Sequence, residues 1–414
     1  MKLGIVIFVL VAATKAWYYG RPEPGSSTQG GVWPLPWTIS YDTYNHTINP
    51  GQFHFVSKVG ACDVIDKAMV RYQKLSFPLF DPSTYSDTAA TLTTLSIAVA
   101  EGCTNGYPQL GMDESYSLLV DRSKGIATLT ANQVWGALRG LETFSQLIYQ
   151  PSRNKYRIRT ASISDSPRFP HRGVMIDSAR HFLPVGIILE HLVGVGNFRI
   201  TGHTGAWGKA FPHLLPLCYN SKGFIDELSN ILDPTQESTF TFLSEFFAEA
   251  LALFKDNYMH FGGDEVSYDM QQCWANNADV TSRMKKMGYT STSQLLNYYW
   301  QRLFTIIDND RSGTKKIVWQ EVLDMNVPAL VLGGEVAMWG EFVDATNLIP
   351  RLWPRASAVA ERLWSDPAAT QSADAAWPRL HEFRCRMMNR GFPVEPPNNP
   401  DYCPYEWNPN YNEI

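Results

Sequence analysis

Residues 258–265 read Tyr-Met-His-Phe-Gly-Gly-Asp-Glu, an apolar segment of strand length that ends in two glycines and two adjacent carboxylates. Gly262 and Gly263 let the backbone approach a ligand closely. Burial of a carboxyl group among apolar side chains raises its pKa, because desolvation disfavours the charged form, and an ionised neighbour raises it further. Asp264 and Glu265 therefore have the chemistry of an acid with a charged partner, although two solvent-exposed loop acids would give the same pattern.

Short apolar segments alternate with helical patterns on both sides of this stretch, and polar and aromatic side chains collect where the segments end. This arrangement is typical of the active face of a (β/α) barrel. We therefore predict an α/β fold with a (β/α)8-type TIM barrel over residues 166–414. The predicted strands are 173–177, 258–262, 316–320 and 329–333, the last running into 335–339, and the predicted helices are 242–254, 294–307, 354–364 and 375–390.

Residues 17–165 have a mixed pattern, which we interpret as a smaller α+β domain before the barrel. Residues 17–32 are rich in Gly, Pro and Ser and predict irregular chain. Trp135 and Phe144 share one face of a predicted helix with Leu138 and Leu141, and Asn132 can cap it. The predicted strands are 52–59, 95–100 and 116–130, the last folded at 122–125, and the predicted helices are 63–77 and 132–149.

The chain has 414 residues and a net charge of −5, with 44% hydrophobic residues. This length suits about two to three domains, and the composition excludes global disorder. The charge gives no attraction for a polyanion, so we expect no nucleic-acid partner. The 13 tryptophans suit a ligand with apolar faces, such as a sugar ring, but composition alone favours an aromatic core.

The N-terminal residues predict entry into the secretory pathway. Lys2, the apolar run 3–13 and small residues at 14 and 16 are typical of a signal peptide over residues 1–16. The run is too short for a stable membrane anchor, and we expect no membrane span. Asn45 begins the glycosylation sequon Asn-His-Thr.

The six cysteines also fit an oxidising compartment, and none forms a Cys-x-x-Cys pair, which argues against zinc. We expect no metal and no cofactor. Six cysteines allow many pairings. Their order along the chain favours the local set Cys62–Cys103, Cys218–Cys273 and Cys385–Cys403.

Further motifs occur in order along the second half of the chain. They are Phe-Pro-His-Arg-Gly at 169–173, Asp-Ser-Ala-Arg-His-Phe at 177–182, His-Phe-Gly-Gly-Asp-Glu-Val at 260–266, Val-Trp-Gln-Glu at 318–321, Gly-Gly-Glu-Val-Ala-Met-Trp-Gly-Glu at 333–341, Arg-Leu-Trp-Pro-Arg at 351–355 and Glu-Arg-Leu-Trp at 361–364. This series resembles glycoside hydrolase family 20, in particular its animal lysosomal β-N-acetylhexosaminidases. The resemblance covers nearly all of the chain after the signal peptide, and the three cysteine pairs match disulfides of the family.

The resemblance implies an exo-acting hydrolase with a substrate-assisted retaining mechanism. Two adjacent carboxylates cannot easily flank a glycosidic bond, so the ordinary retaining geometry fits poorly, whereas the substrate-assisted exception fits well. By resemblance, Glu265 is the general acid and Asp264 holds the N–H of the substrate's 2-acetamido group. Arg172 is similar to the residue that grips the ring 3- and 4-hydroxyls, which suits a guanidinium fork. Trp319 and Trp339 resemble pocket walls, Glu341 the acceptor from the 4- and 6-hydroxyls, and His203 the active-site histidine.

The family resemblance also implies the partners and the compartment of the chain. The expected substrates are glycans with a terminal β-linked GlcNAc or GalNAc, and the expected location is the lysosome or the extracellular space. Family members often dimerise, so a homo- or hetero-dimer is expected as well.

Two intervals are shorter than the family's. Only 31 residues separate Arg172 from His203, where the family fits its second strand, a helix and its third strand, and where an aspartate that partners Arg172 is lost. Only 14 residues separate Trp319 from Gly333, which removes a further pocket Trp and the Tyr that binds the acetamido oxygen. A barrel that lacks strands exposes its edges. The alternatives are therefore a catalytically impaired member that binds glycans or a partner subunit, and a truncated product without function.

Overall fold

The structure is a computed structural model that divides into two compact units. The sheet unit contains the residues up to 172, together with 332–334 and those from 349 onwards, and the second unit contains 173–331 and 335–348. The residues that the structure describes are 27–83, 90–103, 106–152, 155–178, 180–181, 183–184, 186, 204–220, 222–226, 230–253, 258–261, 266, 268–317, 332–397 and 403.

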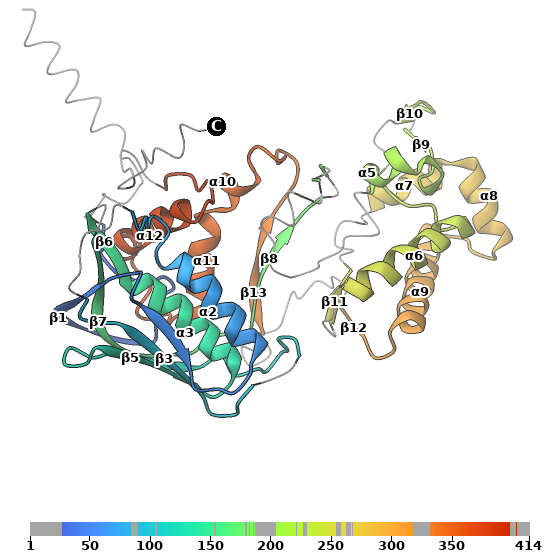
Figure 1. Cartoon of the computed structure of the whole chain (residues 1–414). Coiled ribbons are helices and arrows are strands. Elements are labelled where there is room, and N and C mark those ends of the chain that lie inside the picture. The colour runs from blue at the N-terminus through green and yellow to red at the C-terminus, as the bar shows by residue number, and fades with distance from the viewer. Residues whose placement is uncertain are drawn as a thin grey trace, which may run out of the picture. The chain divides into compact units, whose positions relative to one another are not determined.

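The sheet unit contains a seven-stranded sheet with two helices lying against one face (Figure 1). The strand order is β1-β7-β4-β5-β3-β2, and β6 also pairs with β7. The β2/β3 and β3/β5 pairs are parallel and the others are antiparallel. The elements are β1 (Thr38–Ile48), β2 (His54–Ser57), α2 (Asp63–Leu75), β3 (Thr94–Val99), β4 (Tyr116–Val120), β5 (Ile126–Ala131), α3 (Val134–Leu147), β6 (Ile148–Ser152) and β7 (Lys155–Asp165).

The core of this unit lies between the sheet and the helices, as the sequence periodicities predict. Burial alternates along β4 and β5, which places one set of their side chains on the helix side. Trp135, Leu141 and Phe144 are buried on α3, and Leu138 is partly buried. Phe144 stacks on Phe53 with ring centroids 5.6 Å apart. The predicted α+β arrangement is therefore present.

Two details of the sequence interpretation need correction. Asn132 does not cap α3, because the N-cap residue is Gln133 and the Asn132 amide donates instead to the Asp113 carboxylate. Strands β1, β6 and β7 were not predicted. In β1 a register shift between Tyr41 and Asn45 interrupts the alternation. In β7 the alternation changes phase at Thr160 and Ala161, which are both buried, so the signal is interrupted there as well.

The C-terminal helices α11 (Arg355–Trp364) and α12 (Ala373–Asn389) belong to the sheet unit. The Glu382 carboxylate on α12 accepts from the Gly30 and Gly31 N–H groups at 2.7 and 2.8 Å and from the Thr28 hydroxyl at 2.7 Å. These bonds hold the irregular segment before β1 against the C-terminal helix.

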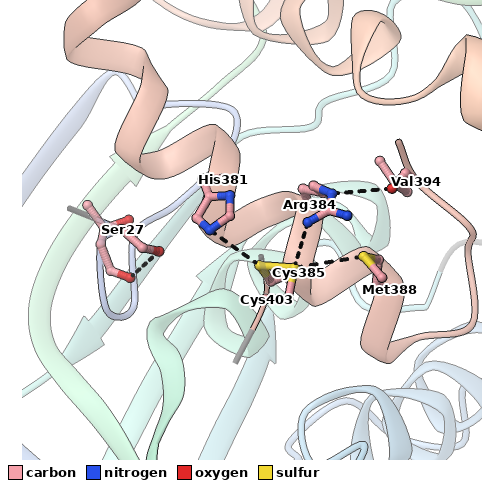
Figure 2. Close-up of a disulfide and its surroundings, with 8 residues drawn as sticks. Ser27, His381, Arg384, Cys385, Met388, Val394 and Cys403 are labelled. Carbon is pink, nitrogen blue, oxygen red and sulfur yellow. Dashed lines mark hydrogen bonds between the residues drawn. A yellow bond between two sulfur atoms is a disulfide. The ribbon is translucent and has the colours of Figure 1, made fainter. Parts of the chain in front are cut away.

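All six cysteines are paired as their order predicts, in Cys62–Cys103, Cys218–Cys273 and Cys385–Cys403. Figure 2 shows the last of these, with Arg384 beside it. Arg384 donates to the Cys403 sulfur at 3.1 Å and to the Val394 carbonyl at 3.2 Å, which fixes the chain after α12. Three disulfides are typical of proteins that fold in an oxidising compartment.

The second unit contains a helical group in which α6 packs against α9. Phe247, Tyr299 and Leu303 are fully buried at this contact. A capping box of Ser291 and Gln294 starts α9. The elements are α5 (Gly205–Ala210), η1 (Pro212–Leu214), β9 (Cys218–Tyr219), β10 (Ile225–Asp226), α6 (Glu237–Leu253), β11 (Tyr258–His260), α7 (Tyr268–Asn276), α8 (Ala278–Lys286), α9 (Thr292–Asp310) and β12 (Lys315–Ile317).

The strands predicted for the barrel form two parallel pairs. One pair is β11 with β12. The other is β8 (His171–Ile176) with β13 (Gly333–Met338). In that second pair the His171 N–H donates to the Leu332 carbonyl and the Asp177 N–H donates to the Met338 carbonyl. The two strands therefore run in the same direction.

The predicted strand 329–333 needs a partial correction. Its residues 329–331 lie outside the described residues, Leu332 precedes the strand, and β13 begins at Gly333. A short helix, α10 (Leu348–Leu352), follows β13. Within the described ranges, none of the helices is long and apolar enough to cross a membrane.

Candidate functional site

The predicted site residues divide into two groups. Asp264, Glu265, His203 and Trp319 lie outside the described residues, whereas Arg172, Trp339 and Glu341 lie within them. The segment that leads to the two carboxylates is described as far as Phe261, which follows β11. Phe261 is fully buried against Phe247, with ring centroids 5.5 Å apart. In sequence, the two carboxylates therefore come shortly after β11, and Phe261, the last described residue before them, is buried in the core.

A buried carboxylate organises the carboxyl ends of β8 and β13. Asp177 follows β8, and its Oδ2 accepts from Arg180 Nη1 at 2.7 Å and from the Gly340 N–H at 3.0 Å. Gly340 approaches so closely that an added Cβ would lie 2.7 Å from the Asp177 carbonyl oxygen. A glycine at this position is therefore required for the two strand ends to meet.

Arg180 connects Asp177 to the two predicted sugar-binding residues on the β13 side. Its Nε lies 3.0 Å from Glu341 Oε1, and its guanidinium lies 4.6 Å from the centre of the Trp339 ring. Trp339 is 38% exposed and the Glu341 side chain 48% exposed. An indole and a carboxylate held side by side by one arginine can pack against an apolar ring face and accept hydrogen bonds from hydroxyls.

Arg172 has a partner that the sequence interpretation missed. Its Nη2 donates to both oxygens of Glu114 at 2.7 Å, and its Nη1 donates to the Phe169 carbonyl at 2.5 Å. Glu114 is buried and also accepts from Arg139 Nε at 2.8 Å. The carboxylate beside Arg172 therefore comes from the loop before β4. One indirect signal was available, because a largely buried arginine needs a carboxylate partner and the expected aspartate was missing.

Two further predictions concern modification and metals. Asn45 lies in β1, opposite Arg159 of β7, and is half-buried. Its glycosylation remains a prediction. Among the described residues, no three His, Cys, Asp or Glu side chains come together in a group that could hold a metal ion.

Two family descriptions match the chain. "Glycosyl hydrolase family 20, catalytic domain" matches residues 195–330 and 324–367. "beta-acetyl hexosaminidase like" matches residues 32–147. The first match falls on the barrel region, and the second covers β1 to α3 of the sheet unit but not β6 and β7.

Curated proteins are similar to the chain along nearly its whole length. A "Beta-hexosaminidase A" of Caenorhabditis briggsae is 34% identical, with 97% of this chain and 98% of that protein covered. A human "Beta-hexosaminidase subunit beta" is 31% identical, with 98% and 94% covered. The first alignment runs over 550 positions, more than the 414 residues of this chain, so the relative carries internal segments that this chain lacks.

Solved structures with the same fold are more distant in sequence. A Flavobacterium johnsoniae chitobiase has a TM-score of 0.64 at 22% identity, covering 88% of this chain and 73% of that one. A Vibrio harveyi GH20 exo-β-N-acetylglucosaminidase in complex with N-acetylglucosamine has a TM-score of 0.64 at 17% identity, covering 91% and 80%. These neighbours have a TIM-barrel catalytic domain after an N-terminal domain, which confirms the predicted fold class.

Proposed function

The chain belongs to glycoside hydrolase family 20, and we propose that it removes terminal β-linked N-acetylhexosamine residues from glycans. The observation that carries the proposal is its likeness to β-hexosaminidases over 97% of its length. The adjacent carboxylates Asp264 and Glu265, which follow the parallel strand β11, support it further.

The proposed mechanism uses the substrate's own acetamido group as the nucleophile. Asp264 accepts a hydrogen bond from the acetamido N–H, so that the acetamido oxygen points at the anomeric carbon. This oxygen attacks while Glu265 gives its proton to the glycosidic oxygen, and the bond to the leaving group breaks. Water then opens the oxazolinium intermediate from the other face, and Glu265 takes its proton. Two inversions retain the anomeric configuration.

Trp339 and Glu341 would bind the terminal sugar in this proposal. The exposed indole suits the apolar ring face, and the half-exposed carboxylate suits hydroxyl donors. Arg180 is a positioning residue, because its contacts with both side chains and with buried Asp177 hold them in place. Trp319 and His203 complete the proposed pocket, and Arg172 would bind the 3- and 4-hydroxyls.

Hydrolysis of a chromogenic β-N-acetylglucosaminide tests the proposal. Secreted, purified protein should release the chromophore at acidic pH, and Glu265→Gln should abolish the release. The control is Glu249→Gln, which makes the same change at an exposed position of α6 and should leave the rate unchanged. No hydrolysis by folded protein would overturn the proposal, as would equal rates for the protein and Glu265→Gln.

A second candidate function is glycan binding without hydrolysis. It is favoured by the internal segments that relatives carry and this chain lacks, because a missing segment can remove groups that the reaction needs while Trp339 and Glu341 stay available to bind a sugar. Thermal melting separates the two functions, because a ligand that binds the native state raises the midpoint. A midpoint raised by N-acetylglucosamine without any hydrolysis supports this candidate.

We also propose the domain division and the compartment that the sequence predicts. Residues 1–16 would be a signal peptide, 17–165 an α+β domain and 166–414 the catalytic domain. The three disulfides support passage through the secretory pathway, towards the lysosome or the cell exterior. Several relatives, the human protein among them, are named as subunits, which supports a dimeric assembly for this chain.

A further inference from the structure

The sheet unit has a cavity of about 600 Å³ at one end of its seven-stranded sheet. It is lined where β3, β5 and β7 end and where β1 and β4 begin. Its volume falls in the usual range for small-molecule sites, roughly 300–1,000 Å³. No residue of the proposed catalytic site lines it, so the cavity is a separate feature of the chain.

A row of hydroxyl side chains crosses four adjacent strands in this cavity. In register, Thr38 of β1 lies opposite Ser164 of β7, Ser164 opposite Ser117 of β4, and Ser117 opposite Thr130 of β5. All four residues are exposed and line the cavity. Their hydroxyls form no side-chain hydrogen bond with any residue that the structure describes. They are therefore free to bond a ligand that is rich in donors and acceptors.

Trp37 stands at the cavity as a fixed aromatic surface. Its indole N–H donates to the Trp364 carbonyl at 2.9 Å, and its backbone N–H donates to Asp165 Oδ1 at 3.0 Å. The residue is nevertheless 43% exposed and lines the cavity. A ring that is already held in place loses little conformational entropy when a ligand packs on it.

Asp165 is the one carboxylate among the lining residues, and its oxygens are already occupied. Oδ1 accepts from the Trp37 and Ser166 N–H groups, and Oδ2 accepts from the Tyr116 hydroxyl at 2.8 Å and Trp364 Nε1 at 2.9 Å. No lysine or arginine lines the cavity. This argues against a phosphate, a sulfate or another strongly charged ligand. A purely apolar ligand would desolvate the hydroxyl row without replacing its hydrogen bonds.

We propose that this cavity is a second, non-catalytic binding site for a neutral oligosaccharide. A sugar ring has an apolar C–H face, which would pack on Trp37, and a rim of hydroxyls, which would bond to the row from Thr38 to Thr130. The sheet unit would thereby hold a part of a glycan away from the site of hydrolysis. The inference concerns binding alone and does not require the chain to hydrolyse the glycan.

Isothermal titration with a trimer of β-1,4-linked N-acetylglucosamine tests the proposal. The full chain carrying Glu265→Gln is used, so that the trimer is not consumed. Trp37→Ala in this background should weaken binding at the cavity by about tenfold or more, because it removes the aromatic surface on which the sugar ring packs. Thr130→Arg fills the cavity with a long side chain, keeps the hydrogen bonds of Trp37, and should weaken binding equally. The control Tyr107→Ala removes an exposed aromatic ring outside the cavity and should change nothing.

The outcomes separate this proposal from the proposed function. Trp37-dependent binding, together with no hydrolysis by the chain that keeps Glu265, supports the cavity site and overturns the hydrolase proposal. Hydrolysis accompanied by trimer binding that neither Trp37→Ala nor Thr130→Arg weakens overturns the cavity site alone. An absence of measurable trimer binding at millimolar concentration also overturns it. Loss of binding in Trp37→Ala but not in Thr130→Arg would indicate structural damage and would count against the site.

Discussion

The strands of the sheet unit and those of the predicted barrel differ in their number of partners. In the seven-stranded sheet, β7, β4, β5 and β3 each pair with a strand on both sides. Among the described residues of the barrel region, β8 pairs with β13 and β11 with β12, one partner each. The first region therefore has a continuous hydrogen-bonded sheet, whereas the described part of the second has two separate parallel pairs and the short antiparallel pair β9/β10.

The two regions also differ in how much of the sequence supplies their strands. The sheet comes from one stretch, residues 38–165, so a change elsewhere removes none of its strands. A closed barrel needs a neighbour on both sides of every strand, and these neighbours come from the whole length of the domain. Relatives carry internal segments that this chain lacks. From the resemblance to the family, we expect these segments to be missing between Arg172 and His203 and between Trp319 and Gly333.

The largest expected effect comes from truncating one buried phenylalanine in each region. Phe144 in the sheet unit and Phe247 in the second unit are both fully buried among aromatic rings. Replacing either by alanine should cost about 3–5 kcal/mol of unfolding free energy, from lost burial and the cavity left behind. We expect Phe144→Ala to lower only the transition of the sheet unit, and Phe247→Ala only that of the second unit, in scanning calorimetry.

The control for this pair is Val70→Ala on α2, where the side chain is exposed and the midpoint should stay unchanged. A single transition that both phenylalanine variants lower equally would contradict the comparison. It would mean that the two units unfold together and that the sheet unit is not stable independently of the second unit.

The next effect concerns the ion pair at the start of β8. Glu114 is buried and accepts from Arg172 and Arg139. Glu114→Gln keeps the shape but removes the charge, which leaves Arg172 without its counter-ion. We expect a loss of about 3 kcal/mol, at the low end for a broken buried pair because Arg139 is half-exposed. Urea denaturation measures it, and Glu101→Gln at an exposed position is the control. Equal midpoints for the two variants would show that the pair contributes nothing.

The fold was predictable from sequence where the signal is local. The face of α3 that carries Trp135, Leu141 and Phe144 follows from a period of 3.6 residues. The motif at 333–341 likewise predicted the strand end that carries Trp339 and Glu341. In β1 a register shift hides the alternation, and Asn132 does not cap α3, because its amide bonds to Asp113 and Gln133 occupies the N-cap position without a capping hydrogen bond.

The site was less predictable because its contacts join distant parts of the chain. Arg180 lies in the quoted motif at 177–182, yet no pattern shows that its side chain lies between Asp177, Trp339 and Glu341. Glu114 precedes Arg172 by 58 residues, and its meeting with that arginine depends on tertiary structure alone. Spacing identifies which residue types gather at a strand end, but it does not identify their partners.

The smallest expected effect is that of an exposed pair in the second unit. The Glu237 side chain is 74% exposed, and its hydrogen bond with Arg302 lowers the pKa of this carboxyl group. Because the pKa of Glu237 is lower in the folded chain than its ordinary value, about 4.3, the ionised carboxylate stabilises the folded state at pH values above 4.3. This stabilisation disappears as the pH falls through the pKa of the folded state.

Glu237→Gln should therefore cost about 0.2–1 kcal/mol of unfolding free energy at neutral pH, and the difference from the parent should shrink in acid and in high salt. Glu249→Gln, at another exposed position of α6, should leave the unfolding free energy unchanged at either pH. Calorimetry of the second-unit transition measures both variants. If Glu237→Gln cost as much in acid as at neutral pH, the effect would come from packing rather than charge. The stability of the second unit would then depend on how side chains pack at the surface of α6.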